Sequence, residues 1–274
     1  MPEGDIVVRV ARRLDAALAG QVLARAELRW PDLGGVDLVG SRVLGHATAG
    51  KHLLTRLDDG RTLHTHLRMD GLWRIVRTGD LAAGTSRADR SHRVRAVLGA
   101  SAWTALGIDL GLMDLVPTAE EHRVVGHLGP DVLGADLDVA AAGRRILDQG
   151  DRDVGEVLLD QRVVAGLGTI YMAESLWAHR ISPWTPAGDL DGAAADVVAT
   201  ARALMLRSVA ARTPRATDDP RRSTNVHGRD RRPCPRCGTP VALGEVGRAP
   251  TARRAFYCPR CQPVPAGRAR PGSR

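Results

Sequence analysis

The chain has 274 residues, of which 43% are hydrophobic and 26% charged, so it is long enough for one or two domains with buried cores. No apolar run approaches the roughly 20 residues of a membrane span, and the N-terminus lacks a basic and then apolar secretory pattern, so we expect a cytoplasmic protein. The net charge of +8 is concentrated in residues 211–274, which hold 15 arginines against four acidic residues. Such a segment is typical of a surface that binds nucleic acid, although a solvated tail has the same composition.

The N-terminal half begins with a helical pattern and continues as short strands. Within residues 5–19, Val7, Ala11 and Leu14 recur at helical spacing, and Asp5 is placed to act as the N-cap. From about residue 21 to residue 111, segments rich in Val, Leu and Thr alternate with turn signals such as "LDDGR" and "RMDG". This pattern predicts an antiparallel β-sandwich or barrel.

The pattern becomes helical after "MDLVPTAEEH", and the last helical stretch is rich in alanine. Residues 212–233 are polar and rich in arginine, as in a loop that leads to the cysteines. A β half followed by an α half implies two packed domains. We find no internal repeat.

All four cysteines fall in one pattern at the C-terminus. Two Cys-Pro-Arg-Cys motifs are separated by twenty residues, which gives four thiolates able to hold one structural Zn²⁺ ion. A redox role needs a CxxC pair beside a βαβ unit, and no such unit is predicted. The segment between the motifs has strand-like ends around a Gly-rich turn, so we expect a hairpin stabilised by the metal. The zinc ligands are Cys234, Cys237, Cys258 and Cys261.

The first residues and one lysine carry possible chemistry. Removal of Met1 would expose the secondary amine of Pro2, a nucleophile that forms a cationic iminium on attack at a sugar C1′ carbon, although Pro2 also suits an ordinary start site. Glu3 beside it is a natural proton carrier. Lys51 is the only lysine among 39 basic residues. An ammonium is more compact than a guanidinium and can release a proton, which favours a role in a crowded site.

Four stretches together resemble the formamidopyrimidine-DNA glycosylase/endonuclease VIII family, and most closely its endonuclease VIII-like, actinobacterial branch. They are "MPEGD" at the start, "GKHLL" around Lys51, "LLDQRVVAGLGTIYMAESLW" at 158–177 and "FYCPRCQ" at 256–262. The resemblance implies an α+β multidomain fold. Its parts would be an N-terminal antiparallel β-sandwich with a leading helix (1–115), a helix–two-turns–helix DNA-binding domain (116–230), a zinc-finger β-hairpin (231–262) and a disordered tail (263–274).

The resemblance also implies a function. The chain would be a bifunctional DNA glycosylase/AP lyase of base excision repair, a cytoplasmic, nucleoid-associated monomer acting on damaged double-stranded DNA. It would excise oxidised bases, chiefly pyrimidines, from an everted nucleotide and nick the strand by β,δ-elimination. The catalytic residues carried over are Pro2 as nucleophile, Glu3 as proton carrier, Lys51 at the sugar-phosphate and Arg253 at the flanking phosphates. The DNA-binding residues carried over are Met69 as an apolar wedge, Gly166, Gly168, Thr169 and Arg254.

Several alternatives stay open at this point. The N–H groups after Gly166-Leu-Gly168 would point at phosphate oxygens, but a tight turn between helices has the same sequence. Thr169 stands where the family usually has asparagine. Its hydroxyl offers one hydrogen-bond donor, whereas the asparagine amide offers two. His64 and His66 would face one side of a strand, either as metal ligands or as hydrogen-bonding groups. A non-catalytic DNA- or RNA-binding protein is the alternative function, and a metal-dependent nuclease would need a carboxylate cluster that we do not find.

Overall fold

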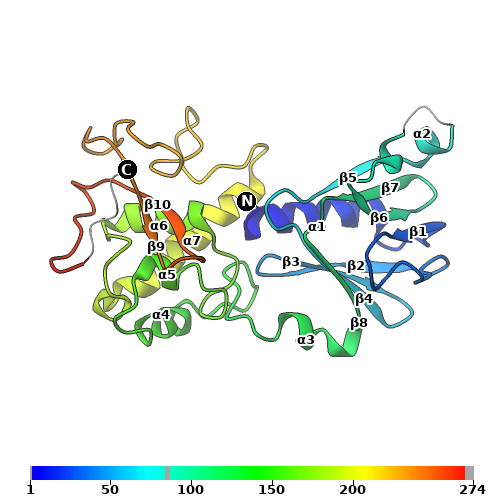
Figure 1. The fold of residues 1–274 in the computed structure, drawn as a ribbon, viewed down its shortest axis with the longest axis horizontal. Helices are drawn as coiled ribbons and strands as arrows, with labels where there is room; N and C mark the ends of the chain where they lie inside the picture. The colour runs from blue at the N-terminus through cyan, green and yellow to red at the C-terminus, as the bar shows by residue number, and fades with distance from the viewer. Residues whose placement is uncertain (1, 84–86, 269–274) are drawn as a thin grey trace. The chain divides into compact units, whose positions relative to one another are not determined.

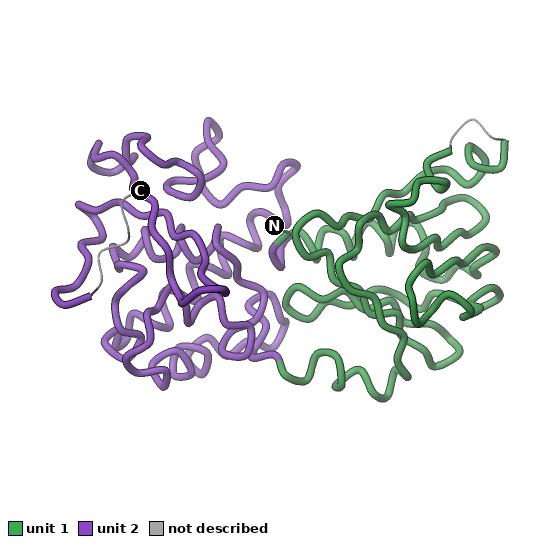
Figure 2. Tube along the Cα trace, viewed as in Figure 1, with its two compact units in different colours: residues 1–2, 6–127 green, residues 3–5, 128–274 purple. Residues whose placement is uncertain are grey.

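The computed structural model describes residues 2–83 and 87–268. The chain forms two compact units, which Figure 2 shows in different colours. One unit comprises residues 1–2 and 6–127, and the other comprises residues 3–5 and 128–274. A short N-terminal segment is thus part of the second unit, although the residues on both sides of it belong to the first.

Two four-stranded antiparallel sheets and helix α1 (Gly4–Leu18) build the first unit (Figure 1). The strand orders are β1-β6-β7-β5 and β2-β3-β4-β8. The strands are β1 (Arg25–Leu28), β2 (Val43–Ala49), β3 (His52–Leu57), β4 (Arg61–His66), β5 (Leu72–Arg77), β6 (Val94–Gly99), β7 (Trp103–Ile108) and β8 (Leu112–Pro117). The short helices are α2 (Thr78–Ala82), α3 (His122–Val125), η1 (Ala88–Arg90) and η2 (Thr118–Glu120).

One aliphatic core joins the two sheets and α1. The apolar stripe predicted for α1 is buried, with Leu14 at 1% exposure, and it packs with residues of both sheets such as Leu53 and Trp73. The β-sandwich with a leading helix is therefore confirmed. The prediction that Asp5 is the N-cap of this helix is wrong, because the helix begins at Gly4 and the Asp5 carboxylate binds other groups described below.

Helices and one hairpin build the second unit. The helices are α4 (Val139–Leu147), α5 (Val154–Val157), α6 (Thr169–His179), η3 (Ala187–Leu190) and α7 (Ala193–Ala210). Strands β9 (Ala242–Val246) and β10 (Arg253–Tyr257) pair antiparallel, and β10 lies beside α6 (Figure 1). Helices α4, α6 and α7 share a core with side chains of both hairpin strands. The predicted order of sandwich, helices and cysteine hairpin is the observed one.

The end of the described chain is attached to the second unit. Arg268 donates to Asp153 at 3.3 Å and pairs with Asp151. The rest of the tail predicted to be disordered, residues 269–274, lies outside the described residues, as does Met1. Of the helices in the described ranges, none has the length and apolar character needed to cross a membrane.

Candidate active site

The carboxylate of Glu3 is buried against the start of helix α6. Only 1% of Glu3 is exposed. Its oxygens accept hydrogen bonds from the backbone N–H groups of Gly168 and Ile170, each at 2.8 Å, and the N–H of Tyr171 lies at 3.5 Å. The first N–H groups of a helix have no partner within it and carry partial positive charge, so this position stabilises an ionised carboxylate. Glu3 is therefore held in one place as an anion.

The glycines before α6 make room for the N-terminal segment. A Cβ atom on Gly168 would lie 2.3 Å from Cδ of Glu3, and one on Gly4 would lie 3.2 Å from Gly166. The Gly4 N–H also donates to the Gly166 carbonyl oxygen at 3.0 Å. The sequence predicts that N–H groups here face phosphate oxygens, but those of Gly168 and Ile170 bind Glu3 instead. The motif thus serves to seat Glu3.

Asp5 forms a second buried contact of the same segment. It is 3% exposed, and its Oδ2 accepts hydrogen bonds from the hydroxyls of Tyr171 at 2.7 Å and Ser208 at 2.6 Å. Burial and the Asp5 charge raise the pKa of Tyr171, so its hydroxyl stays a donor. These contacts join the N-terminal segment to α6 and α7. These contacts cannot be predicted from the sequence, because the three residues lie far apart in the chain.

Glu174 organises the loop that reaches the first residue of α6. Its carboxylate, 1% exposed, accepts the N–H groups of Asn225, Val226 and His227 at 2.8 to 2.9 Å. Burial raises the pKa of Glu174, and these backbone donors oppose the shift. The loop places Nε2 of His227 at 3.3 Å from the hydroxyl of Thr169. A ring nitrogen of His227 therefore lies beside the Thr169 hydroxyl. An asparagine at this position, as is usual in the family, would offer the nitrogen of its own amide.

Lys51 and Met69 belong to the first unit. Lys51 lies in the turn between β2 and β3 and is 7% exposed. Met69 lies in the turn between β4 and β5 and is 62% exposed, as an apolar wedge must be. Met113 is 1% exposed and packs in the core of the sandwich, so it is not available as a second wedge.

The four cysteines come together at the base of the β9–β10 hairpin. Their Sγ atoms all lie within 4.8 Å of one another, and no other group of three or more His, Cys, Asp or Glu side chains in the described ranges is placed to share a metal ion. Nε1 of Trp177 donates to Sγ of Cys234, and the N–H of Cys261 donates to Sγ of Cys258, each at 3.4 Å. N–H donors to sulfur stabilise thiolates, so the donor set fits a tetrahedral metal such as Zn²⁺.

The two hairpin arginines begin strand β10. Arg253 and Arg254 are both exposed and lie opposite Val246 and Glu245 in the ladder. Nη1 of Arg253 donates to the carbonyl oxygen of Thr251 at 2.9 Å. The hairpin therefore presents two guanidinium groups to solvent at its turn end, away from the cysteines at its base.

Comparison with known proteins decides what this arrangement belongs to. The model of the formamidopyrimidine-DNA glycosylase N-terminal domain matches residues 1–105, and that of the formamidopyrimidine-DNA glycosylase H2TH domain matches residues 128–217. A Streptomyces coelicolor protein named "Probable endonuclease 8 2" is 43% identical over 100% of this chain and 98% of its own length. The chain belongs to the formamidopyrimidine-DNA glycosylase/endonuclease VIII family. It is a DNA glycosylase/AP lyase of the endonuclease VIII-like kind.

Other relatives and solved structures agree with this membership. The Mycolicibacterium smegmatis protein named DNA-(apurinic or apyrimidinic site) lyase Nei2 is 36% identical over 96% of this chain and 99% of its own length. A MutM bound to DNA containing carbocyclic 8-oxo-G has the same fold, with a TM-score of 0.79 at 23% identity, over 96% of this chain and 100% of the other. A Lactococcus lactis Fpg bound to DNA with an abasic site gives 0.78 at 22% identity, over the same shares.

Metal removal is expected to damage the hairpin of this glycosylase and leave the sandwich folded. A hairpin this small buries little core of its own, so its folding would depend on a metal ion held by the four cysteines. We expect a chelator, or Cys258→Ala, to lower the melting temperature of the second unit by about 10 °C. Protease cleavage within residues 231–262, followed by mass spectrometry, measures the loss of the hairpin. Unchanged protection after complete removal of the metal would contradict a structural role.

A chain of hydrogen bonds joins three side chains on the sheet that carries Lys51. Nδ1 of His64 lies 3.1 Å from Oδ2 of Asp114, and its Nε2 lies 2.7 Å from Nδ1 of His52. His64 thus bonds through both ring nitrogens, as the hydrogen-bonding alternative requires. The backbone N–H of Arg68 donates to Nδ1 of His66 at 2.9 Å, so the neutral ring of His66 carries its hydrogen on Nε2. That nitrogen is then a donor and cannot ligate a metal.

These histidines make the enzyme sensitive to acid. Burial and the neighbouring histidines lower the pKa of His52 to about 3, and burial, Arg68 and Lys51 lower that of His66 to about 4. Between these values and about 6.5 the unfolded chain binds more protons than the folded one, so stability falls as the pH falls through that window. Because both rings are partly exposed, we expect a loss of only about 2 kcal/mol between pH 7 and pH 4.5.

Urea unfolding at these two pH values measures that loss. His52→Gln should reduce the difference between them, whereas the exposed His92, changed to Gln as a matched control, should leave it unchanged. An equal pH dependence in the His52 variant and the parent enzyme would contradict the assignment.

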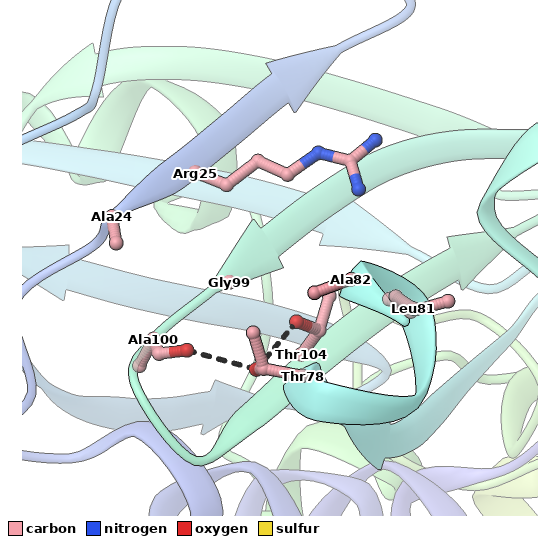
Figure 3. A pocket seen from close by; sticks show the side chains of 8 residues that line it. All are labelled: Ala24, Arg25, Thr78, Leu81, Ala82, Gly99, Ala100 and Thr104. Atoms are coloured by element: carbon pink, nitrogen blue, oxygen red, sulfur yellow. Dashed lines mark hydrogen bonds between the residues drawn. The ribbon is translucent and has the colours of Figure 1, made fainter. Parts of the chain in front are cut away.

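A small cavity of about 150 Å³ in the first unit lies elsewhere on the sandwich (Figure 3). Nη1 of Arg25, on its wall, already donates to Asp89 at 2.7 Å. The hydroxyl of Thr78 donates to the carbonyl oxygen of Ala100 at 2.8 Å and lies 2.9 Å from that of Thr104. The polar groups of this cavity are thus already used, and we assign it no part in the reaction.

Proposed function

We propose that the deprotonated nitrogen of Pro2, after removal of Met1, attacks C1′ of an everted, damaged nucleotide. The N-glycosidic bond breaks and the base leaves with a proton taken from solvent, while the sugar ring opens to an iminium that joins C1′ to the Pro2 nitrogen. The iminium acidifies the C2′ proton. Its removal expels the 3′ phosphate, and a second elimination expels the 5′ phosphate. Eversion is required because C1′ is out of reach inside the base stack.

The seating of Glu3 is the observation that carries this proposal. Glu3 follows Pro2 directly, is buried, and has both oxygens fixed by the start of α6. A carboxylate held in this way next to the nucleophile is suited to accept the proton that the Pro2 nitrogen loses on attack and to transfer it to the sugar ring oxygen as the ring opens. A chain that merely bound DNA would have no need for a buried, positioned acid directly after Pro2.

The remaining residues are proposed to bind the DNA. Lys51 approaches the sugar-phosphate of the lesion, and Arg253, with Arg254 beside it, binds the flanking phosphates. Met69 fills the space left by the everted base, and Thr169 belongs to the DNA-binding surface around α6. Gly166 and Gly168 are buried, and their part is to seat the N-terminal segment with Glu3. Structural Zn²⁺ on the cysteines holds the hairpin that carries the arginines. The enzyme would act in the cytoplasm, on the nucleoid, as a monomer on damaged duplex DNA.

Oxidised pyrimidines are the proposed substrates. This choice is supported by the relatives from Streptomyces, Mycobacterium tuberculosis and Mycobacterium bovis, whose names all contain endonuclease 8, at 35% to 43% identity over nearly the whole chain. It is tested by comparing base release from duplexes that contain an oxidised pyrimidine or 8-oxoguanine.

Borohydride trapping tests the covalent mechanism. The enzyme is mixed with duplex DNA that contains an abasic site or an oxidised pyrimidine, and the iminium is reduced to a stable adduct. We expect an adduct whose peptide map places the DNA on Pro2. A non-catalytic binder of DNA or RNA would give no adduct, and a metal nuclease would lose strand cleavage when treated with EDTA.

Lys51→Arg is expected to slow base excision by about tenfold while DNA affinity stays within about threefold. The guanidinium keeps the positive charge, but it is larger than the ammonium and cannot release a proton. Single-turnover excision and a tetrahydrofuran-DNA binding assay separate the two effects. Unchanged excision by the arginine variant would show that the only lysine has no special role.

A further inference from the structure

Asp5 is a buried carboxylate that the proposed reaction does not use. It is 3% exposed, and the two groups that donate to its Oδ2 are hydroxyls, those of Tyr171 and Ser208. Tyr171 is 2% exposed and Ser208 is 0% exposed. Within residues 2–83 and 87–268, no arginine, lysine or histidine forms an ion pair with Asp5.

A buried charge without a cation is costly, and a neutral acceptor would serve as well if only two hydroxyls had to be bound. We therefore ask what a carboxylate at position 5 does that a neutral side chain could not do. The nearest event on the chain that creates positive charge is the attack by Pro2, which converts a neutral amine into a cationic iminium.

Chain geometry brings this charge within range of the Pro2 nitrogen. Pro2 and Asp5 are three positions apart in the chain, so their Cα atoms lie at most about 10 Å from each other. Helix α1 begins at Gly4, so Gly4 and Asp5 lie in its first turn and the segment is shorter than a fully extended chain. At this range and an effective dielectric constant near 20, one negative charge favours a cation by about tenfold in an equilibrium or rate.

We propose that Asp5 is a positioning residue for Pro2, whose buried carboxylate anchors the N-terminal segment and stabilises the cation that forms on the Pro2 nitrogen. This inference rests on the proposed function. Asp5 holds the segment through Tyr171 and Ser208, while Glu3 is held separately by α6. The two carboxylates thus have different tasks, because Glu3 transfers a proton and Asp5 anchors the segment.

The test is the pH dependence of iminium formation by Asp5→Asn. Duplex DNA with an abasic site is used at saturation, because it separates imine formation from base release, and the adduct is trapped with borohydride from pH 5.5 to pH 9. On the alkaline plateau, where the amine is deprotonated, we expect trapping about tenfold slower than in the parent enzyme. Loss of the negative charge should also move the acid limb of the profile to lower pH by about 0.5 to 1 unit.

Matched variants separate charge from anchoring. Ser208→Ala removes one anchor and keeps the charge, so we expect a loss of under about threefold and no displacement of the profile. Asp15→Asn changes another carboxylate of the same helix, and we expect it to match the parent enzyme. The affinity of each variant for tetrahydrofuran-containing DNA should stay within about threefold of the parent, since Asp5 is buried and only 3% exposed.

Two results would overturn the inference. One is an unchanged rate and profile in Asp5→Asn, and the other is equal slowing of Asp5→Asn and Ser208→Ala with no displacement, which would make Asp5 an anchor only. Should Asp5→Asn fail to fold, Asp5→Glu decides, because it keeps the charge. A retained profile supports the inference, and a displaced one contradicts it. Absence of an adduct with the parent enzyme would instead count against the proposed function.

Discussion

An enzyme that retains an extra residue ahead of Pro2 is expected to lose covalent trapping by at least about 1000-fold. The reason is electronic, because acylation converts the Pro2 amine into a tertiary amide whose nitrogen lone pair is delocalised into the carbonyl. The lone pair that would attack C1′ is then no longer available. A leucine inserted between Met1 and Pro2 produces such a chain, and the yield of borohydride adduct per minute measures the effect.

The same extension offers its own control. A longer leader that ends in a protease site directly before Pro2 should block trapping until cleavage and restore the full rate afterwards. Affinity for tetrahydrofuran-containing DNA should be within about threefold before and after cleavage, because no DNA-binding side chain changes. An extended enzyme that still forms the adduct at the parent rate would move the nucleophile elsewhere, with Lys51 as the first residue to examine.

The elements of the fold were predictable where one local pattern decided them. The stripe on α1 repeats over four turns, and turn signals such as "LDDGR" separate β3 from β4. Strand β2 was less visible, because it carries an irregularity in register between Val43 and Gly45 and leaves Leu44 59% exposed. The hairpin could be predicted from the cysteine spacing alone, because the four thiolates can meet at one site only if the segment between the two motifs folds back on itself.

Contacts between distant residues were harder to predict. The resemblance named Glu3 and Gly168 separately. Only the structure shows that the backbone N–H of Gly168 holds the Glu3 carboxylate, although the two residues are 165 positions apart in the sequence. Asp5 was interpreted as a helix cap because its neighbours are helical, whereas its real partners lie on α6 and α7. By contrast, the pairing of His52 with His66 follows from hairpin register about the "LDDGR" turn, so that signal was present and was not used.

The contact between Glu3 and Gly168 gives the second large expected effect. Gly168→Ala would place a methyl group 2.3 Å from Cδ and 2.5 Å from Oε1 of Glu3, although the backbone of Gly168, with φ −132° and ψ −164°, suits any residue. The whole cost of this substitution therefore comes from displacing the Glu3 carboxylate. We expect a loss of about 3 kcal/mol in stability and about a 100-fold loss in base release.

Glu3→Gln separates the chemistry from the packing at the same contact. The glutamine keeps the shape, but its NH₂ group must face one of the N–H donors of Gly168 or Ile170, which costs about 1 to 2 kcal/mol. Loss of the proton carrier should slow base release by about 100- to 1000-fold. The adduct formed on a ready-made abasic site should fall less, because no base has to leave.

A double-mutant cycle tests whether the two residues act as one unit. Once the Glu3 side chain is removed by Glu3→Ala, Gly168→Ala has nothing to displace, so its cost in stability should fall to under about 0.5 kcal/mol. Gly192→Ala is the matched control, because no atom lies within 4 Å of its added Cβ. Urea unfolding gives the four stabilities, and single-turnover base release gives the rates. Additive effects of the two substitutions would mean that Gly168 is required for a reason other than seating the carboxylate, and the buried contact would then lose its place in the proposed mechanism.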